Sequence, residues 1–403
     1  MGGVEAKIRE ERLITGSEAI AEAVRAADVD VVAAYPIRPY TGVMNAIAKM
    51  IADGKFDAEY IIADSEHSQF EIAKHASSVG ARVFTGSSGV GLMYAFEVLT
   101  VTPGDRLPVV AMVGNRALDD PGAFGVEHND MLAARDLGWL MCWPESPQEA
   151  LDMTLMAYRI SEDPKVLLPS AVNVDGSFIT HVRHPVSIPL RDEVEEFLPP
   201  YTLKNRLHPD RPLTIAPQVD QDWLMEIRKQ NDEAAKRAKA ITELAHKEFR
   251  SVFGRGGDPY LEEYMTEGAD VALIGMGSLA TSLKATVRKL RAEGKKVGFI
   301  KLKRFRPFPT ERLQKALSKF KAVGVIDRDY SYGSAHGGGV IFQEIRSALY
   351  TLPEKPLIIG FIAGLGGREV TIENASQMAK ITTNAAKAGR VERESYWIGV
   401  RGL

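Results

Sequence analysis

An arginine held between two prolines is the residue of this chain whose position most directly suggests chemistry. Arg38 lies in the segment Tyr35-Pro36-Ile37-Arg38-Pro39, directly after the apolar run Val31–Ala34. Each proline fixes its own φ and favours an extended conformation in the residue before it, so the loop is stiff. Loops at the carboxyl ends of strands are where open α/β sheets bind ligands. A planar, permanently charged guanidinium group at such a place predicts a site for a carboxylate or a phosphate.

Two further segments follow expected strands in the same way. The run 60–63 is followed by Ser65-Glu66-His67, and the run 83–85 by the small-residue loop Gly86-Ser87-Ser88-Gly89-Val90-Gly91. Taken alone, Glu66 is explained as a carboxylate at the positive end of a helix dipole. The loop lacks the lysine of a P-loop and a complete Gly-x-Gly-x-x-Gly spacing. It is therefore expected to let backbone approach a cofactor ring or a neighbouring subunit.

The order of these segments resembles the α-subunit, or first domain, of the thiamine-diphosphate-dependent 2-oxoacid:ferredoxin oxidoreductases. The similarity continues along nearly the whole chain, at 107–110, 115–116, 128–130, 148–150, 304–309 and 325–328. Pyruvate enzymes of this family usually place threonine between the two prolines, where this chain has Arg38. That substitution, the stretch Arg116-Ala117-Leu118-Asp119 and the tail Ser395-Tyr396-Trp397 are most similar to the oxalate oxidoreductase α-subunit.

The resemblance implies a role for several residues. Glu66 becomes the catalytic carboxylate beside the pyrimidine ring of the cofactor, and Pro36, Ile37, Gly89 and Val90 become cofactor-binding residues. The family's Gly-Asp-Gly motif for diphosphate and magnesium is missing, since the nearest fragment, 174–177, lacks the first glycine and a suitable downstream asparagine. We therefore expect no metal ligand on this chain. A partner β-subunit should supply the half of the site that binds the diphosphate and the magnesium ion.

Arg38, Arg116 and Asp119 are the expected substrate-binding residues. Arg116 follows the strand 109–113, where the resemblance implies an arginine that binds the substrate carboxylate. Two guanidinium groups in one pocket repel each other unless a dianion lies between them, and oxalate is the smallest such 2-oxo compound. Asp119 either neutralises one arginine in the empty site or serves as a turn residue before Pro121.

Two alternatives to oxalate oxidation stay open. The first is a pyruvate or bulkier arylglyoxylate oxidoreductase of the same family, in which Arg38 binds a single carboxylate and the product is an acyl-CoA. The other alternative is a non-catalytic scaffold subunit that keeps the fold for assembly. The role of His128-Asn129-Asp130, which matches the family only partly, also stays open.

Composition limits the partners of the chain. The formal net charge of -3, without a long basic face, gives no reason to expect nucleic acid or an anionic membrane. The charged amino terminus is unlike a signal peptide and no apolar stretch is long enough to span a membrane, so a cytoplasmic protein is expected. The single cysteine, Cys142, excludes a cysteine-ligated iron-sulfur cluster held by this chain alone. Electrons should reach ferredoxin through clusters on an iron-sulfur partner subunit.

The 403 residues predict two or three domains. Residues 1–190 alternate apolar strands (29–34, 60–63, 83–85, 109–113, 140–143 and 166–170) with helical segments, which predicts a doubly wound α/β domain. This is the expected pyrimidine-side thiamine-diphosphate-binding domain. Residues 191–265 are expected to form a linker, irregular in the proline-rich stretch 185–217, and a long helix at 220–253. Residues 266–403 are expected to form a second α/β domain, transketolase-C-like by resemblance.

Overall fold

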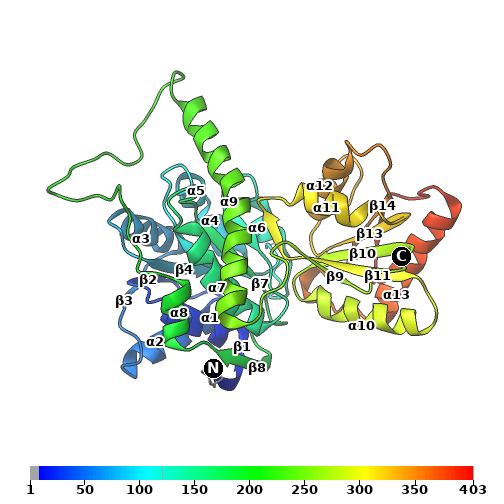
Figure 1. The fold of residues 1–403 in the computed structure, drawn as a ribbon, viewed down its shortest axis with the longest axis horizontal. Helices are drawn as coiled ribbons and strands as arrows, with labels where there is room; N and C mark the ends of the chain where they lie inside the picture. The colour runs from blue at the N-terminus through cyan, green and yellow to red at the C-terminus, as the bar shows by residue number, and fades with distance from the viewer. Residues whose placement is uncertain (1–8, 120, 403) are drawn as a thin grey trace, which may run out of the picture.

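The computed structural model describes residues 9–119 and 121–402, and Figure 1 shows two α/β units side by side. The amino-terminal unit is blue to green and the carboxyl-terminal unit yellow to red. Each unit is built on a largely parallel sheet, which confirms the expected α/β class. A small antiparallel ribbon, β1 (Glu10–Thr15) with β8 (Arg183–Ile188), lies near the amino terminus.

The first sheet has seven strands in the order β12-β6-β7-β5-β4-β2-β3. Its strands are β2 (Val31–Ala34), β3 (Glu59–Ile62), β4 (Val83–Ser87), β5 (Val110–Asn115), β6 (Leu140–Cys142), β7 (Ser170–Asp175) and β12 (Arg304–Arg306). All pairings are parallel except that of β12 with β6. The central strands are buried along their whole length, as both faces of a parallel sheet require.

The second sheet has six strands in the order β15-β14-β13-β10-β11-β9. Its strands are β9 (Leu261–Tyr264), β10 (Val271–Met276), β11 (Val297–Leu302), β13 (Ala322–Asp327), β14 (Leu357–Ile362) and β15 (Ser395–Trp397). Only the edge strand β9 is antiparallel to its neighbour. It begins five residues before residue 266, the expected start of this domain. The division of the chain at residues 190 and 265 stays a prediction.

The helices divide the apolar residues into three cores. One face of the first sheet is covered by α1 (Gly16–Ala26), α2 (Thr41–Ala52), α7 (Pro147–Ser161), α8 (Arg191–Phe197) and α9 (Leu224–Phe253). The other face is covered by α3 (Glu66–Ser78), α4 (Gly89–Tyr94), α5 (Phe96–Val101) and α6 (Asn129–Ala133), and this core continues into the second unit under α11 (Thr310–Leu317) and α12 (Val340–Leu349). The far face of the second sheet is covered by α10 (Leu279–Ala292) and α13 (Ile372–Ala388). No helix of the described residues is long and apolar enough to cross a membrane.

The structure corrects two predictions about local structure. The strand expected at 166–170 is a turn and an extended approach, with the amides of Val166 and Leu167 both bonded to the Asp163 carbonyl oxygen. The strand in this region is β7, and its polar residues interrupt the apolar pattern that predicts a buried strand. Asn173, for example, is fully buried and donates to the Cys142 carbonyl oxygen at 3.2 Å. The stretch 185–217 was expected to be irregular, but it contains the end of β8 and all of α8.

A buried polar cluster joins the two units. The Asp175 carboxylate, at the end of β7, accepts hydrogen bonds from His128 Nε2 at 2.7 Å, Ser278 Oγ at 2.6 Å and Arg328 Nη1 at 2.7 Å. Ser278 and Arg328 belong to the second unit, and Asp175 and His128 are fully buried. Burial alone would raise the pKa of Asp175, but His128 and Arg328 outweigh it and hold the pKa below its usual value. The Asp175 carboxylate therefore makes its hydrogen bonds at the interface between the two units. This structural role accounts for an aspartate at position 175 although the diphosphate motif around it is incomplete.

Asp175→Asn should lower the free energy of unfolding by about 3 kcal/mol at pH 7, because Arg328 keeps its buried charge without a partner. Since the folded pKa of Asp175 lies below the unfolded value of about 3.9, its contribution is present above that pH and fades as the pH falls below it. Urea titrations at pH 7 and at about pH 3 measure both effects. Asp53→Asn, at an exposed pair with Lys49, is the control and should change stability far less than Asp175→Asn does. Equal losses in the two variants, or a loss that does not shrink in acid, would contradict this account.

Candidate active site

The predicted site residues follow four adjacent strands of the first sheet. Arg38 follows β2, Glu66 follows β3, Gly89 follows β4 and Arg116 follows β5, in the sheet order β5-β4-β2-β3. All four strands are parallel, so their carboxyl ends meet at one edge of the sheet. The structure therefore brings together residues that lie almost 80 positions apart in the sequence.

Glu66 is a nearly buried carboxylate without a partner. It is the first residue of α3, which Ser65 caps by accepting a hydrogen bond from the Ser68 amide. Its residue is 8% exposed, yet among the described residues no hydrogen bond or ion pair reaches its carboxylate. The carboxylate packs on Gly91, where an added Cβ would lie 2.8 Å from Glu66 Cδ and 2.6 Å from Ile37 Cδ1. Glu66 and Ile37 thus pack so closely on Gly91 that only glycine fits there, and the Glu66 carboxylate is left to accept a donor from outside this chain.

The two predicted substrate arginines lie beside each other around an aromatic ring. The guanidinium carbons of Arg38 and Arg116 are 5.9 and 5.6 Å from the centre of the Phe124 ring, within the range of cation–π attraction. Arg116 Nη1 also donates to the Arg38 carbonyl oxygen at 3.1 Å. Phe124 is 70% exposed, so this arrangement faces outward.

Asp119 lies at the edge of the arginine pair. Its Oδ2 is 3.8 Å from Arg116 Nη2, and its side chain is about one third exposed. This is the distance of a weak ion pair rather than a hydrogen bond. The geometry fits the expectation that Asp119 neutralises an arginine, although the role itself stays a prediction.

Gly89 packs directly against Arg116. A Cβ added to Gly89 would lie 2.9 Å from Arg116 Nε, and the residue has a positive φ of 49°, so glycine is required for two reasons. Val90, the next residue, is 37% exposed at the start of α4, and Pro36 is exposed as well. Pro39 packs on β5, since a Cβ on Gly114 would lie 2.5 Å from its Cγ. The proline-bracketed loop is thereby fixed against the strand that carries Arg116.

Asp130 is a site residue whose role the sequence left open. Its carboxylate is fully buried and accepts hydrogen bonds from the amides of Gly89 at 3.1 Å and Arg116 at 3.0 Å, and from Asn115 Nδ2 at 2.8 Å. Burial raises the pKa of Asp130 above its usual value, against these hydrogen bonds. A single carboxylate therefore joins the loop after β4 to the loop after β5. Phe124 was also missed, because an aromatic residue in a loop carries no signal in one sequence.

His67 lies close to two carboxylates. Its Nε2 is 3.0 Å from Glu97 Oε2, and one ligand atom each of His67, Glu71 and Glu97 lie within 4.8 Å of one another. Glu71 is shared with Lys74 Nζ at 2.9 Å and His75 Nδ1 at 3.1 Å. Because a lysine ammonium already neutralises Glu71, this cluster gives no reason to assign a metal ion.

Comparisons with known proteins decide the family. The sequence model of the pyruvate flavodoxin/ferredoxin oxidoreductase thiamine-diphosphate-binding domain matches residues 22–247, and that of the pyruvate:ferredoxin oxidoreductase core domain II matches residues 269–375. The chain belongs to the 2-oxoacid:ferredoxin oxidoreductase α-subunit family.

Relatives in this family are similar over nearly their full length. The pyruvate synthase subunit PorA of Pyrococcus abyssi is 40% identical over 390 residues, which are 96% of this chain and 98% of that protein. PorA of Methanothermobacter thermautotrophicus is 39% identical, with 97% of this chain and 98% of the relative covered. The ketoisovalerate oxidoreductase subunit VorA of Pyrococcus horikoshii is 36% identical, with 96% and 97% covered. The family thus includes subunits of enzymes with different 2-oxo acid substrates.

Solved structures agree with the fold of this oxidoreductase family. A 2-oxoglutarate:ferredoxin oxidoreductase from Magnetococcus marinus is similar over 92% of this chain and 65% of its own, with a TM-score of 0.67 and 20% identity. A split-gene transketolase is similar over 94% of this chain and all of its own, with a TM-score of 0.54 and 14% identity. At these identities the likeness concerns the fold alone, and it agrees with the expected transketolase-like architecture.

Proposed function

We propose that this chain is the α-subunit of a hetero-oligomeric 2-oxoacid oxidoreductase and supplies the pyrimidine-side half of its thiamine diphosphate site. The observation that carries this proposal is the nearly buried Glu66 carboxylate, which has no partner among the described residues. A protonated ring nitrogen of the cofactor would provide that partner, and Gly91 allows the Glu66 carboxylate to lie where a Cβ on residue 91 would collide with it. When bound, thiamine diphosphate supplies a nucleophilic carbon and an electron sink for decarboxylation. Glu66 would hold the ring nitrogen in its protonated form.

The remaining parts of the enzyme belong to partners in this proposal. A β-subunit supplies the diphosphate and magnesium half, since Asp175 of the only related fragment is bonded to His128, Ser278 and Arg328. Cys142 is buried, and burial raises the pKa of its thiol to about 11, so it suits neither a cluster nor reactive chemistry. An iron-sulfur subunit would therefore carry the electrons to ferredoxin, in the cytoplasm.

The substrate proposed from the geometry is oxalate. Arg38 and Arg116 contribute two positive charges at one end of the site, and among the described residues Asp119 is the carboxylate within ion-pair distance of them. A dianion between the two guanidinium groups would relieve their repulsion and accept charge-assisted hydrogen bonds from both. Oxidation would then release two carbon dioxide molecules per oxalate and pass two electrons onward. Coenzyme A is not needed, since no acyl group remains.

Pyruvate is the second candidate, and the relatives support it better than oxalate. The two PorA proteins described above are named as pyruvate synthase subunits, and they are up to 40% identical to this chain. In that case Arg38 binds the single carboxylate of the substrate, and coenzyme A accepts the acetyl group. A bulkier arylglyoxylate is a third member of the same class.

A substrate panel on the purified complex would test this proposal. Carbon dioxide release and dye reduction are measured with oxalate, pyruvate, 2-ketoisovalerate and phenylglyoxylate, each with and without coenzyme A. Turnover of oxalate without coenzyme A supports the oxalate proposal, and turnover of pyruvate only with coenzyme A overturns it in favour of the second candidate. An assembled complex that binds thiamine diphosphate and turns over none of them would support the scaffold alternative.

A further inference from the structure

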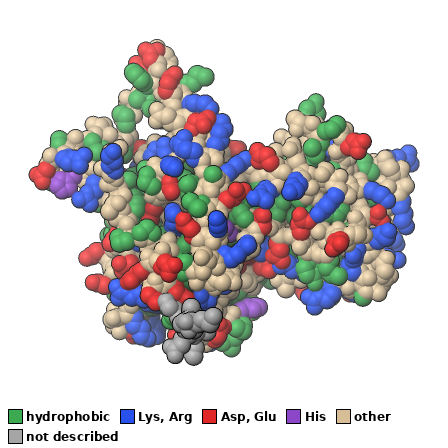
Figure 2. Space-filling view, viewed as in Figure 1, with side chains coloured by type: hydrophobic (Ala, Val, Ile, Leu, Met, Phe, Trp, Pro, Cys, Tyr) green, Lys and Arg blue, Asp and Glu red, His purple; other side chains and the backbone are tan. Residues whose placement is uncertain are grey.

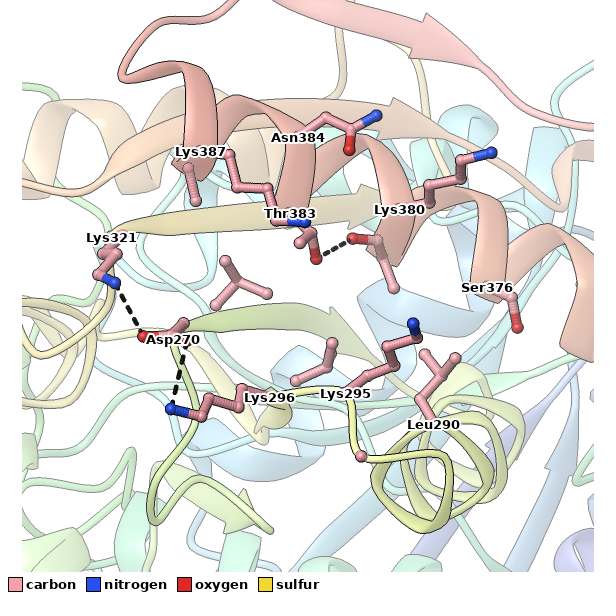
Figure 3. A pocket seen from close by; sticks show the side chains of 15 residues that line it. Asp270, Leu290, Lys295, Lys296, Lys321, Ser376, Lys380, Thr383, Asn384 and Lys387 are labelled. Carbon is pink, nitrogen blue, oxygen red and sulfur yellow. Dashed lines mark hydrogen bonds and ion pairs between the residues drawn. The ribbon is translucent and has the colours of Figure 1, made fainter.

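A pocket of about 610 Å³ lies in the carboxyl-terminal unit, outside the site described above. It opens between the end of α10 and the face of α13, next to the starts of β10 and β11 (Figure 3). Arg328 and its contacts with the first unit follow the opposite, carboxyl end of this sheet. The pocket is therefore separated from the candidate active site by the length of the sheet, and its volume is typical of small-molecule sites.

The lining of this pocket is strongly basic. Its charged side chains are Asp270 and five lysines, Lys295, Lys296, Lys321, Lys380 and Lys387, which gives the lining a formal charge of +4. In Figure 2, Lys and Arg side chains gather at the outer edge of the carboxyl-terminal unit. The amino groups of Lys295 and Lys387 extend into the space between α10 and α13 (Figure 3).

Only two of these lysines have a carboxylate partner. Asp270 lies 3.0 Å from Lys321 and 4.0 Å from Lys296, and its pKa is lowered chiefly by the Lys321 hydrogen bond. No carboxylate of the described residues lies within ion-pair distance of Lys295, Lys380 or Lys387. Lys295 and Lys387 therefore face the pocket, and Lys380 points outward at its rim (Figure 3), all three without a counter-charge from the part of the chain that the structure describes.

Helix dipoles do not account for this charge. Both α10 and α13 end at the pocket, and each carboxyl end contributes about half a negative charge. Together they offset about one of the four positive charges, and roughly three remain. An anion with two or more charges is needed to balance them.

The walls between the lysines are apolar. Val271, Val297 and Ala379 are 1 to 2% exposed and Leu290 is 9% exposed, so the part of the pocket under the charged rim is apolar. Thr383 Oγ1 is turned back onto the Ala379 carbonyl oxygen at 2.8 Å, which keeps this wall free of polar hydrogens. A planar aromatic ring attached to a polyanion matches both the apolar wall and the lysine rim of the pocket.

We propose that this pocket binds a nucleoside di- or triphosphate, with the phosphates between Lys295 and Lys387, Lys380 at the rim beside them, and the base on the apolar wall of Val271, Leu290 and Val297. A free polyphosphate would offer the lysines the same negative charges as a nucleotide. The apolar wall is the reason to favour a nucleotide, because only a nucleotide carries a base that can pack on it. The site is independent of the proposed substrate and cofactor.

Isothermal titration of the full chain with ADP, pyrophosphate and adenosine would test it. We expect saturable binding of one ADP, at least tenfold tighter than pyrophosphate or adenosine and weaker at higher salt. In the triple variant Lys295→Gln, Lys380→Gln, Lys387→Gln the affinity for ADP should fall at least tenfold. These lysines are exposed, so the substitutions should leave folding intact, which circular dichroism checks.

A matched control carries three exposed substitutions outside the pocket, Lys165→Gln, Lys204→Gln and Lys247→Gln. This variant has the same net charge as the pocket variant and should keep the wild-type affinity. No saturable binding to the wild type, or equal weakening in both variants, would overturn the proposal. Unchanged ADP binding in the pocket variant would place the nucleotide elsewhere, and equal affinities for ADP and pyrophosphate would overturn the nucleotide assignment.

Discussion

Glu66→Gln is expected to leave the complex assembled and thiamine diphosphate bound, but to reduce turnover by about 10²- to 10⁴-fold, the range of general acid–base effects. The amide has nearly the shape of the carboxylate but cannot hold a protonated ring nitrogen by charge. Exchange of the cofactor's C2 proton for deuterium, followed by NMR on the loaded complex, measures this step separately from substrate binding. Since Glu66 has no hydrogen-bond or ion-pair partner among the residues that the structure describes, the variant should be no less stable than wild type.

Glu97→Gln is the matched control for this experiment. Glu97 is an exposed carboxylate near the same helix and pairs with His67. Its replacement should leave proton exchange unchanged. If the rate of C2 proton exchange in Glu66→Gln is within threefold of the wild-type rate, Glu66 is not the catalytic carboxylate. The family assignment would not be affected.

Arg38→Thr should lower oxalate turnover at least tenfold while activity on pyruvate or glyoxylate holds or rises. The variant removes one charge-assisted contact to the second carboxylate, worth about 1.5 to 3 kcal/mol, and each 1.4 kcal/mol is a factor of ten. Values of kcat/KM for oxalate, pyruvate and glyoxylate on the purified complex give the comparison. The charge is lost at an exposed side chain, so stability should change little.

Arg116→Lys provides the comparison at the second guanidinium group. Arg116 is 6% exposed and donates to the Arg38 carbonyl oxygen, so this replacement should impair every 2-oxo acid alike. A parallel loss on oxalate and pyruvate in Arg38→Thr would exclude the oxalate proposal and favour the pyruvate candidate. It would not affect the family assignment, which depends on the whole chain.

The sequence predicted the strands of the first sheet where apolar residues are contiguous. β2, β4 and β5 lie within a few residues of their predicted positions, because a strand buried on both faces needs an uninterrupted apolar run, and β3, an exposed edge strand, also lies close to its predicted position. β7 broke this rule. Its Ser170, Asn173 and Asp175 are buried polar residues whose partners come from Ser161, Cys142 and the second unit. Such partners are distant in the sequence, so a local pattern cannot identify them.

Tertiary structure alone decided how the two units are joined. β12 leaves the second unit to pair with β6 of the first sheet, and Trp143 packs edge-to-face against Phe305 with ring centres 6.1 Å apart. Nothing local in residues 304–306 distinguishes a strand that joins a different sheet. Its register is set by long-range packing, whose free energy depends on surfaces that exist only once both units have folded.

For the candidate site, the sequence by itself determined which residue types follow each strand and which family they resemble. The stiff Pro36-Ile37-Arg38-Pro39 loop, Glu66 and the glycine loop were identifiable because backbone chemistry is local. Only the folded chain decided that both arginines lie beside the Phe124 ring and that Asp130 joins the Gly89 and Arg116 loops. Those contacts depend on the order of strands in the sheet, and strand order is set by burial of the whole core rather than by any one segment.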